Sequence, residues 1–365
     1  MKKVFCKMAL AAVLALTTLF TGCKAPSSGG GSAYNPPEKN IPLTLEAIAD
    51  GQITFSNLDR ITNLKYRIND GEVTAATDTG ISLSAGDKIS FFAQGTSNED
   101  SVSLCFRIIC SSDCYVYGNV MSLLTADYQT ATEIPQNYAF AYLFYANIHI
   151  KNHPSKNIVL PATTLASSCY YYMFYSCTSL TQAPVLPAKA LADACYYGMF
   201  YGCTSLTQAP ALPATTLADS CYMGMFYNCS SLTQAPVLPA KALAFSCYAR
   251  MFSGCTSLTQ APALPATTLA GYCYAGMFYG CTSLTQAPAL PATTLANSCY
   301  FAMFSGCTSL NKVTCLATNL SAAECTDEWL SGVASSGTFT KASGADWSVK
   351  TGFDGIPSGW TIKNK

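Results

Sequence analysis

Hydrophobic and polar positions in the middle of the chain repeat with a fixed period of 26 residues. The first copy covers residues 160–185 with the sequence LPATTLASSCYYYMFYSCTSLTQAPV. Five further copies begin at Leu186, Leu212, Leu238, Leu264 and Leu290. Residues 138–159 resemble a degenerate earlier copy with a polar end. A constant period in this range predicts a stack of units, each burying its apolar face against its neighbours.

Each copy contains two adjacent rows of apolar residues at intervals of four. In the first copy the rows are Leu165, Cys169 and Met173, and, one residue further on, Ala166, Tyr170 and Phe174. Adjacent rows with this spacing predict a helix of about three turns. A glycine soon afterwards in most copies, such as Gly202, is typical of a helix end. Residues 179–184 predict one short extended segment per copy, in which proline prevents a long ladder.

One extended piece and one helical piece per copy predict a mixed α and β fold. Neighbouring strands stack about 4.8 Å apart, whereas packed helices need roughly 8–10 Å. The stack should therefore bend, with the extended segments on its inner side. We expect a curved solenoid of the leucine-rich-repeat type over residues 136–315, built from six units and the degenerate first unit.

The region before the repeats has the pattern of short strands separated by turns. Residues 64–68 and 72–74 flank Asn69-Asp70-Gly71, which is a strong hairpin signal. Two further strand-like runs lie on either side of residues 84–87. Several short strands within residues 41–135 predict a β-sandwich-like domain. A Cys110–Cys114 bridge in this region is one open alternative.

The region after the repeats, residues 316–365, predicts a small cap rich in tryptophan. Ser321 and Glu324 form a capping box, so a helix should follow to about Leu330. Residues 337–341 and 360–363 have strand character. All three tryptophans of the chain, Trp329, Trp347 and Trp360, lie here. We expect them to cover the apolar end that stacking leaves open; an aromatic binding site is the alternative.

The N-terminus has the layout of an export signal. Lysines at positions 2, 3 and 7 precede an uncharged stretch over residues 8–20, which is too short to span a membrane. The sequence Leu19-Phe20-Thr21-Gly22-Cys23 resembles the lipobox of bacterial lipoproteins. This resemblance implies that residues 1–22 are removed as a signal peptide and that Cys23 is lipidated. Residues 23–40, rich in Ser, Gly and Pro, are typical of a flexible tether.

The repeat itself resembles a known family. Each copy has a leucine, then Leu-Pro a few residues later, and then Met-Phe-x-x-Cys-x-Ser-Leu. This pattern is similar to the BspA-like leucine-rich repeats of bacterial surface proteins. The resemblance covers about half of the chain, from residue 138 to about residue 315. It implies a surface-exposed adhesion or interaction protein, and thus binding and not catalysis. With the lipobox it implies a lipid-anchored protein of the bacterial cell envelope, exposed at the outer membrane.

Composition and charge exclude several functions. The net charge is zero and only 11% of residues are charged, which argues against nucleic acid as a partner. The chain has two histidines, and the six copies contain none, so a cysteine nucleophile there would lack a base. No pair of carboxylates recurs from copy to copy. We therefore expect no enzyme activity, no metal and no cofactor.

The cysteines of the repeats are expected to be apolar filler. Cys6 leaves with the signal and Cys23 carries lipid, so 17 of the 19 cysteines remain, and 12 of these lie in the six copies. The spacing Cys-x7-Cys is poor for zinc, which favours two to four intervening residues. On a helix the two cysteines of one copy would be about 12 Å apart, beyond disulfide reach. Buried free thiols are the expected state; disulfides between copies are the alternative in an exported protein.

Positions that vary between copies indicate the exposed surface. They lie directly after the repeated tyrosine and directly after Met-Phe, and they carry mostly uncharged, aromatic residues. The candidate binding residues are Tyr171, Tyr175, Tyr197, Tyr201, Tyr227, Tyr279 and Phe301. Such a strip suits a protein partner or sugar rings, because tyrosine offers a large rigid contact area. Two functions follow: an adhesin or protein-interaction module, or a carbohydrate-binding surface lipoprotein of a nutrient-capture system.

Overall fold

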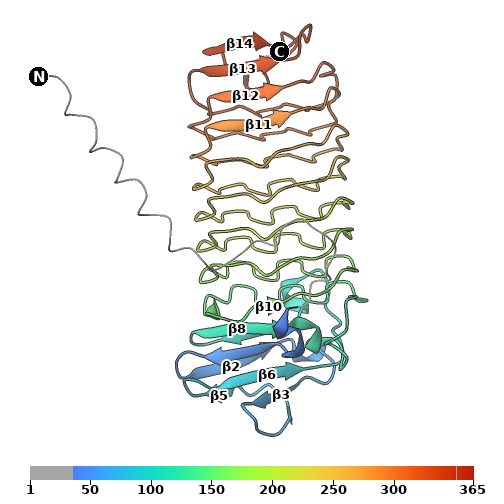
Figure 1. The fold of residues 1–365 in the computed structure, drawn as a ribbon, viewed down its shortest axis with the longest axis vertical. Coiled ribbons are helices and arrows are strands. Elements are labelled where there is room, and N and C mark those ends of the chain that lie inside the picture. Colours follow the sequence, from blue (N-terminus) through green and yellow to red (C-terminus); the bar gives the residue numbers. More distant parts are fainter. Residues whose placement is uncertain (1–35, 351) are drawn as a thin grey trace, which may run out of the picture. The chain divides into compact units, whose positions relative to one another are not determined.

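Strands at the start of the folded region form two sheets. The computed structural model describes residues 36–350 and 352–365, so the signal peptide, Cys23 and most of the expected tether lie outside the described residues. The larger sheet has the order β10-β8-β1-β6-β3-β4, with β9 also paired to β8, and the smaller has the order β5-β2-β7 (Figure 1). The strands are β1 (Thr44–Ala47), β2 (Gly51–Ser56), β3 (Lys65–Ile68), β4 (Thr74–Ala75), β5 (Ile81–Leu83), β6 (Lys88–Phe92), β7 (Arg107–Cys110), β8 (Cys114–Asn119), β9 (Ile150–Asn152) and β10 (Ile158–Val159).

The two sheets pack face to face through apolar side chains. Phe55 of β2 meets Phe91 of β6 edge to face, with ring centres 6.0 Å apart, and stacks on Phe106. The predicted hairpin is confirmed, because β3 and β4 pair antiparallel around the turn at residues 69–71. Short 3-10 helices connect the strands: η1 (Pro37–Asn40), η2 (Leu58–Arg60), η3 (Val102–Leu104) and η4 (Val120–Leu123). The η1 helix occupies the last residues of the expected tether, so the ordered fold begins before residue 41.

The larger sheet reaches into the degenerate first copy of the repeats, and the coils between it and β11 are joined by isolated β-bridges. Strands β9 and β10 belong to the degenerate first copy, and both lie parallel to β8. One hydrophobic core runs from Leu43, the residue before β1, to Trp360 near the C-terminus. The sheet region therefore closes one end of the stack of repeats.

Each repeat forms one flat coil made of consecutive turns, and the predicted helix is wrong. Every fourth residue in the segment has a positive φ, for example Ser168, Tyr172 and Ser176 at +54°, +49° and +52°. The N–H of Met173 donates to the carbonyl three residues back, whereas the N–H of Phe174 donates to Met199 of the next coil. This alternation between local bonds and bonds to the next coil recurs along the stack. The described residues contain no α-helix, so the mixed α and β class is corrected to a strand-and-turn solenoid.

The turns explain the spacing that suggested a helix. Consecutive four-residue turns place every fourth side chain on the inner side of the coil. A helix also places residues four apart on one face, so the two backbones give the same pattern of apolar residues. The difference is that alternate N–H groups need an acceptor on the next coil, which a stack of similar copies supplies. The curved solenoid was predicted from the difference between strand spacing and helix packing distance. Because the described coils contain no helix, that reason for curvature is absent. The coils in Figure 1 rise as an evenly spaced stack.

A parallel sheet and three tryptophans form the C-terminal end. The order β11-β12-β13-β14 joins the last repeat to the tail, with β11 (Gln286–Leu290), β12 (Lys312–Cys315), β13 (Gly337–Lys341) and β14 (Trp360–Asn364), and η5 (Gly352–Asp354) precedes the last strand. The two strands predicted in the tail are confirmed. The helix predicted after Ser321 is wrong, because Glu324 and Glu328 have positive φ as in the other coils.

The tryptophans continue and then close the aromatic core. Trp329 stacks on Tyr300 on one side and on Trp347 on the other, at 6.1 Å and 5.4 Å. Trp360 is also buried, and its indole N–H donates to the carbonyl of Ala334. These contacts agree with the expectation that the tryptophans cover the open end.

Candidate interaction surface

Two columns of side chains run along one side of the coils. Their aromatic members reach the surface, whereas the small members Ala249, Ala275, Ser253 and Ser305 are buried, so the expectation that all varying positions are exposed is wrong for these four. The first column follows the buried tyrosine of each copy: Tyr171, Tyr197, Met223, Ala249, Ala275 and Phe301. The second follows Met-Phe: Tyr175, Tyr201, Tyr227, Ser253, Tyr279 and Ser305. The seven aromatic candidates from the sequence therefore lie on one side of the solenoid, and we call this side the tyrosine face.

Rings of the tyrosine face stack on one another from coil to coil. In the second column Tyr175 stacks on Tyr201 at 4.9 Å, and Tyr201 stacks on Tyr227 at 4.4 Å. In the first column Tyr171 and Tyr197 stack at 4.8 Å. Stacking leaves these rings half-buried, whereas the isolated Tyr279 is 51% exposed. The rings are thus fixed before any partner arrives, which lowers the entropy lost on binding.

The structure adds tyrosines that the sequence pattern did not single out. Tyr145 of the degenerate copy stacks on Tyr175 at 4.6 Å and extends the second column by one coil. The ring of Tyr172 packs against the rings of Tyr171 and Tyr175 and lies over Gly198, whose lack of a side chain makes room for it. Burial raises the pKa of Tyr172 well above its ordinary value, so the ring is neutral. The alignment of Leu143-Phe144-Tyr145 with Met-Phe-Tyr was the available signal for Tyr145.

The face is interrupted where small residues replace the rings. Ser253 stands in the second column between Tyr227 and Tyr279, and Ala249 and Ala275 stand in the first column between Met223 and Phe301. The result is a hollow of about 590 Å³. Its lining also includes Arg250, Tyr272, Gly276 and Glu328.

Beneath the tyrosine face lies a core of stacked rings and thiols. Buried tyrosines from Tyr170 to Tyr300 stack at 5.6–6.2 Å, and the phenylalanines beside them stack likewise. All 17 cysteines among the described residues are buried and unpaired. The thiol of Cys203 donates to the carbonyl of Phe174 in the preceding coil at 3.0 Å, and equivalent cysteines do the same. Burial raises the pKa of Cys203 to about 12, so this thiol is not a nucleophile at neutral pH.

Cys110 and Cys114 of the adjoining strands also remain free thiols. The neighbouring Cys114 raises the pKa of Cys110, and burial raises it further. The bridge considered from their spacing is not formed in the structure.

A second surface on the repeats is apolar and contains proline. Shallow hollows of about 440 Å³ and 270 Å³ lie between successive Ala-Pro-x-Leu-Pro segments. Val185 and Val237 project from this surface and are 47% and 78% exposed. We call it the proline face. It has no aromatic ring and no charge among the residues that line these hollows, so it offers few directional contacts.

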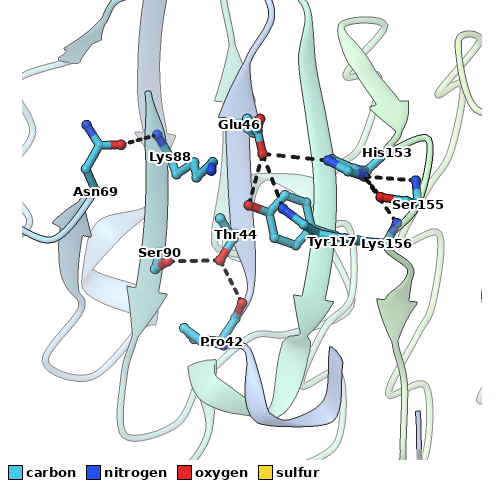
Figure 2. Close-up of polar contacts among 10 residues, drawn as sticks. All are labelled: Pro42, Thr44, Glu46, Asn69, Lys88, Ser90, Tyr117, His153, Ser155 and Lys156. Carbon is cyan, nitrogen blue, oxygen red and sulfur yellow. Dashed lines mark hydrogen bonds and ion pairs between the residues drawn. The ribbon is translucent and has the colours of Figure 1, made fainter. Parts of the chain in front are cut away.

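One cluster of titratable groups lies on the larger sheet, and Figure 2 shows its contacts. The hydroxyl of Tyr117 donates to Oε2 of Glu46 at 3.1 Å, and the ammonium of Lys156 lies 3.5 Å from the same oxygen. His153 Nε2 lies 3.7 Å from it. The Nδ1 of His153 accepts the N–H groups of Ser155 and Lys156, both at 3.1 Å.

These contacts join the larger sheet to the degenerate first coil, which indicates a structural role. Because its Nδ1 already accepts two backbone N–H groups, His153 is poorly placed to act as a general base. Burial raises the pKa of Tyr117, and the Glu46 carboxylate raises it further, so the phenol is neutral. The other histidine, His149, contacts Asp113 at 3.1 Å and has a similar position between sheet and coil.

Within the described ranges, no group of His, Cys, Asp and Glu side chains is arranged to hold a metal ion. Nor does any helix in that part of the chain have the length and apolar character to cross a bilayer.

The fold and its surfaces define a repeat solenoid of the kind that presents an extended face to a partner. A family model for the BspA type leucine-rich repeat region matches six copies, over residues 129–259, 167–301 and 219–325. These matches cover more than half of the chain, and the protein belongs to this family. No curated protein and no solved structure shows significant similarity to the chain.

Proposed function

We propose that the protein is a non-catalytic binding module of the bacterial cell surface, which holds a protein partner on the tyrosine face. Membership of the BspA type repeat family supports an interaction or adhesion role. The observation that carries the proposal is the continuous ring stack from Tyr145 to Tyr227, with ring centres 4.4–4.9 Å apart. Preorganised aromatic rings with little charge suit the apolar centre of a protein interface.

The proposal includes a lipid anchor at Cys23 and a place at the outer membrane. It rests on the lipobox-like sequence at residues 19–23 and on the short apolar stretch before it. The tether that follows would hold the solenoid away from the membrane. Replacing Cys23 (Cys23→Ser) should release the protein from the membrane fraction and remove the mass of the acyl chains. Unchanged fractionation and mass would refute the anchor.

The binding role is tested by capture on an array of extracellular matrix proteins. The probe is the chain from residue 24 onward, and the variant is Tyr175→Ser/Tyr201→Ser/Tyr227→Ser. Serine occupies the equivalent positions at Ser253 and Ser305, so the coils accept it. Capture should fall by about tenfold or more, on the order of a hot-spot loss.

A matched control lies on the proline face. Val237→Ala changes an exposed side chain to the residue present at Ala211 and Ala263, and capture should not change. If the proline-face variant loses capture and the tyrosine variant retains it, the tyrosine face is not the binding surface.

Carbohydrate binding is the second candidate. The exposed rings of Tyr272 and Tyr279, 40% and 51% accessible, are suited to stacking on the apolar face of a sugar. A glycan array with the same variants separates the two functions, because a nutrient-capture protein would bind neutral oligosaccharides and ignore the matrix proteins.

A further inference from the structure

The proline face presents the same outward row of side chains in four successive coils. In the segments 185–189, 211–215, 237–241 and 263–267, the first and last residues are exposed, and the second and fourth are buried. Side chains of an extended segment alternate between its two sides, so the first, third and fifth residues point outward together. These positions carry valine or alanine, then proline, then lysine or threonine. Three columns of side chains therefore cross the four coils.

The first and third columns alternate from coil to coil. The sequence Val-Leu-Pro-Ala-Lys is followed one coil later by Ala-Leu-Pro-Ala-Thr, and the next two coils repeat this order. The valines project, with Val185 47% and Val237 78% exposed. The alanines leave space: Ala211 lines the smaller hollow of this face, and Ala263 lines the larger one. Projections and hollows thus follow one another at intervals of one coil, about 4.8 Å.

This alternation makes the face complementary to a second copy of itself in one orientation. A two-fold axis parallel to the extended segments, between the coils of Ala211 and Val237, reverses the order of the coils and keeps each column opposite its own copy. Val237 then faces the partner's Ala211, and Val185 faces the partner's Ala263. Each lysine likewise faces a threonine. With the two solenoids parallel, every valine and every lysine would instead meet its own copy.

We propose that two copies of the chain associate through the proline face, with their solenoids antiparallel and each valine in a hollow of the partner. This interface goes beyond the proposed function, because it uses a different face. The four coils span about 19 Å, and the segment between the β-bridges at Gln182 and Ala190 spans about 30 Å. The contact would bury roughly 1,100 Å² in total, at the low end for specific interfaces, so a dimer of micromolar affinity is expected.

A second copy matches this face better than another apolar partner. Two valines two coils apart, about 10 Å, require two hollows at the same interval, and the coils of Ala211 and Ala263 provide that interval. A flat apolar surface would contact the valines and leave the hollows empty. Such a contact would bury less apolar area and gain less from the hydrophobic effect.

Sedimentation equilibrium of the chain from residue 24 onward tests the dimer. Between about 1 and about 100 μM the wild type should pass from monomer to dimer. Val185→Ala/Val237→Ala removes both projections and leaves coils like that of Ala211, so it should weaken the dimer by about tenfold or more. Val73→Ala is the matched control, because Val73 is 52% exposed between β3 and β4. It should leave the dimer within about twofold of the wild type.

Ala211→Val distinguishes a fitted contact from general apolar association. It gives this coil the residue that Val185 and Val237 provide in the neighbouring coils, so the coil should fold as before. It adds apolar surface to the face but places a valine opposite the partner's Val237. The dimer should therefore weaken by about fivefold or more through overpacking. Association driven by apolar surface alone would become tighter.

Spin labels on the two single variants Thr204→Cys and Thr282→Cys report the orientation. Both threonines are exposed, and the cysteines of the described coils are buried, so labelling is selective. In the antiparallel dimer the two copies of residue 204 are offset by one coil, and those of residue 282 by five coils, about 24 Å. The distance between the two labels should therefore be longer at residue 282 than at residue 204.

Each outcome decides the inference. It is overturned by a wild-type chain that stays monomeric at about 100 μM, by an unchanged dimer in the double alanine variant, by tighter association of Ala211→Val, or by equal label distances at the two sites. Thermal unfolding checks that each variant is folded. Capture of matrix proteins is compared at nanomolar concentration, where the chain is monomeric. If capture through the tyrosine face persists while the dimer fails, the proposed function stands and only this interface is wrong.

Discussion

At the scale of single residues, side chains of similar chemistry have different roles because of their position on the coil. Tyr170 is buried and stacks in the core, whereas Tyr171, the next residue, belongs to the tyrosine face. The two cysteines of a copy also differ. Cys229 donates its thiol to the carbonyl of Phe200, whereas Cys221 of the same copy fills space without such a bond.

This difference can be measured by truncating each cysteine. Both side chains are fully buried, so Cys229→Ala and Cys221→Ala remove the same volume. Cys229→Ala should cost about 1 kcal/mol more in the free energy of unfolding, because it also removes a hydrogen bond. Urea denaturation compares the two variants. Equal costs would mean that the thiol bond to Phe200 adds nothing.

The thiols should also be unreactive in the folded protein. Burial raises the pKa of these groups, as for Cys203 and Cys307 at about 12, so neither access nor thiolate is available. Alkylation under native conditions should label few of the 17 described cysteines, and denaturation without a reductant should expose most of them. Six or more disulfides in the non-reduced protein, detected by mass, would contradict this.

A pH effect on stability is expected from His153. Burial lowers its pKa, and the neighbouring Lys156 and Lys88 act in the same direction, against the carboxylate of Glu46. The unfolded ring takes up a proton near pH 6.5, while the folded ring does so only at lower pH. Stability is therefore retained above about pH 6.5 and falls as the pH drops from there towards the folded pKa.

His153→Asn keeps an acceptor for the two backbone N–H groups and does not titrate. The urea midpoint of the wild type should fall more between pH 7.5 and 5.5 than that of the variant, both pH values being chosen to bracket roughly the unfolded pKa. His149 is present in both proteins and serves as an internal control. Identical pH dependence of the two midpoints would exclude His153 as the source.

At the scale of the element, the sequence predicted the inward residues correctly and their backbone wrongly. The rows through Cys169 and Met173 are buried as expected, because a four-residue turn and a helix bring the same positions inward. A discriminating signal was present in Gly198, which lies within the predicted helix. It stands four residues before Gly202 at the predicted helix end, and both glycines have positive φ. Hydrogen bonds to the next coil depend on neighbouring copies, so the pattern of one copy alone does not show them.

One glycine distinguishes the two backbones directly. Gly224 has a φ of +59°, and no atom lies within 4 Å of a Cβ built there. Gly224→Ala should therefore destabilise the coil by about 1 kcal/mol through the backbone alone, since a left-handed residue disfavours a side chain. In a helix the same change would be stabilising by about 1 kcal/mol. The sign of the change in urea midpoint decides between them.

The candidate surface was partly predictable in the same sense. Variation between copies identified the two columns and the seven aromatic candidates. The stacking of Tyr175, Tyr201 and Tyr227 could not be predicted, because it depends on the spacing between coils that hydrogen bonds set. The hollow forms where two adjacent copies carry Ala249, Ser253 and Ala275 instead of larger side chains, and this is apparent only when the copies are compared side by side.

At the scale of the whole molecule, stability should come mainly from contacts between neighbouring coils. Deleting residues 212–237 removes one whole period. Ala211 is then bonded to Leu238, which occupies the same position in its copy as Leu212, so the repeat stays in register. That protein should fold with a modest loss of stability, whereas deleting half a period would misalign the buried rows. Removing the tail from Ser321 should be more damaging, because it exposes Tyr300, which Trp329 covers. Thermal unfolding of the three truncated proteins measures these effects. The capped solenoid would be contradicted if the tail deletion were harmless and the whole-period deletion abolished folding.

The central claim is that the tyrosine face is where a partner binds. Hydroxyl-radical footprinting, read by mass spectrometry with and without a captured matrix protein, tests it on the unmodified chain. Oxidation of Tyr175, Tyr201 and Tyr279 should fall in the complex, while that of Val185 and Val237 on the proline face stays unchanged. Protection confined to the two valines, with the tyrosines oxidised as before, would contradict the account.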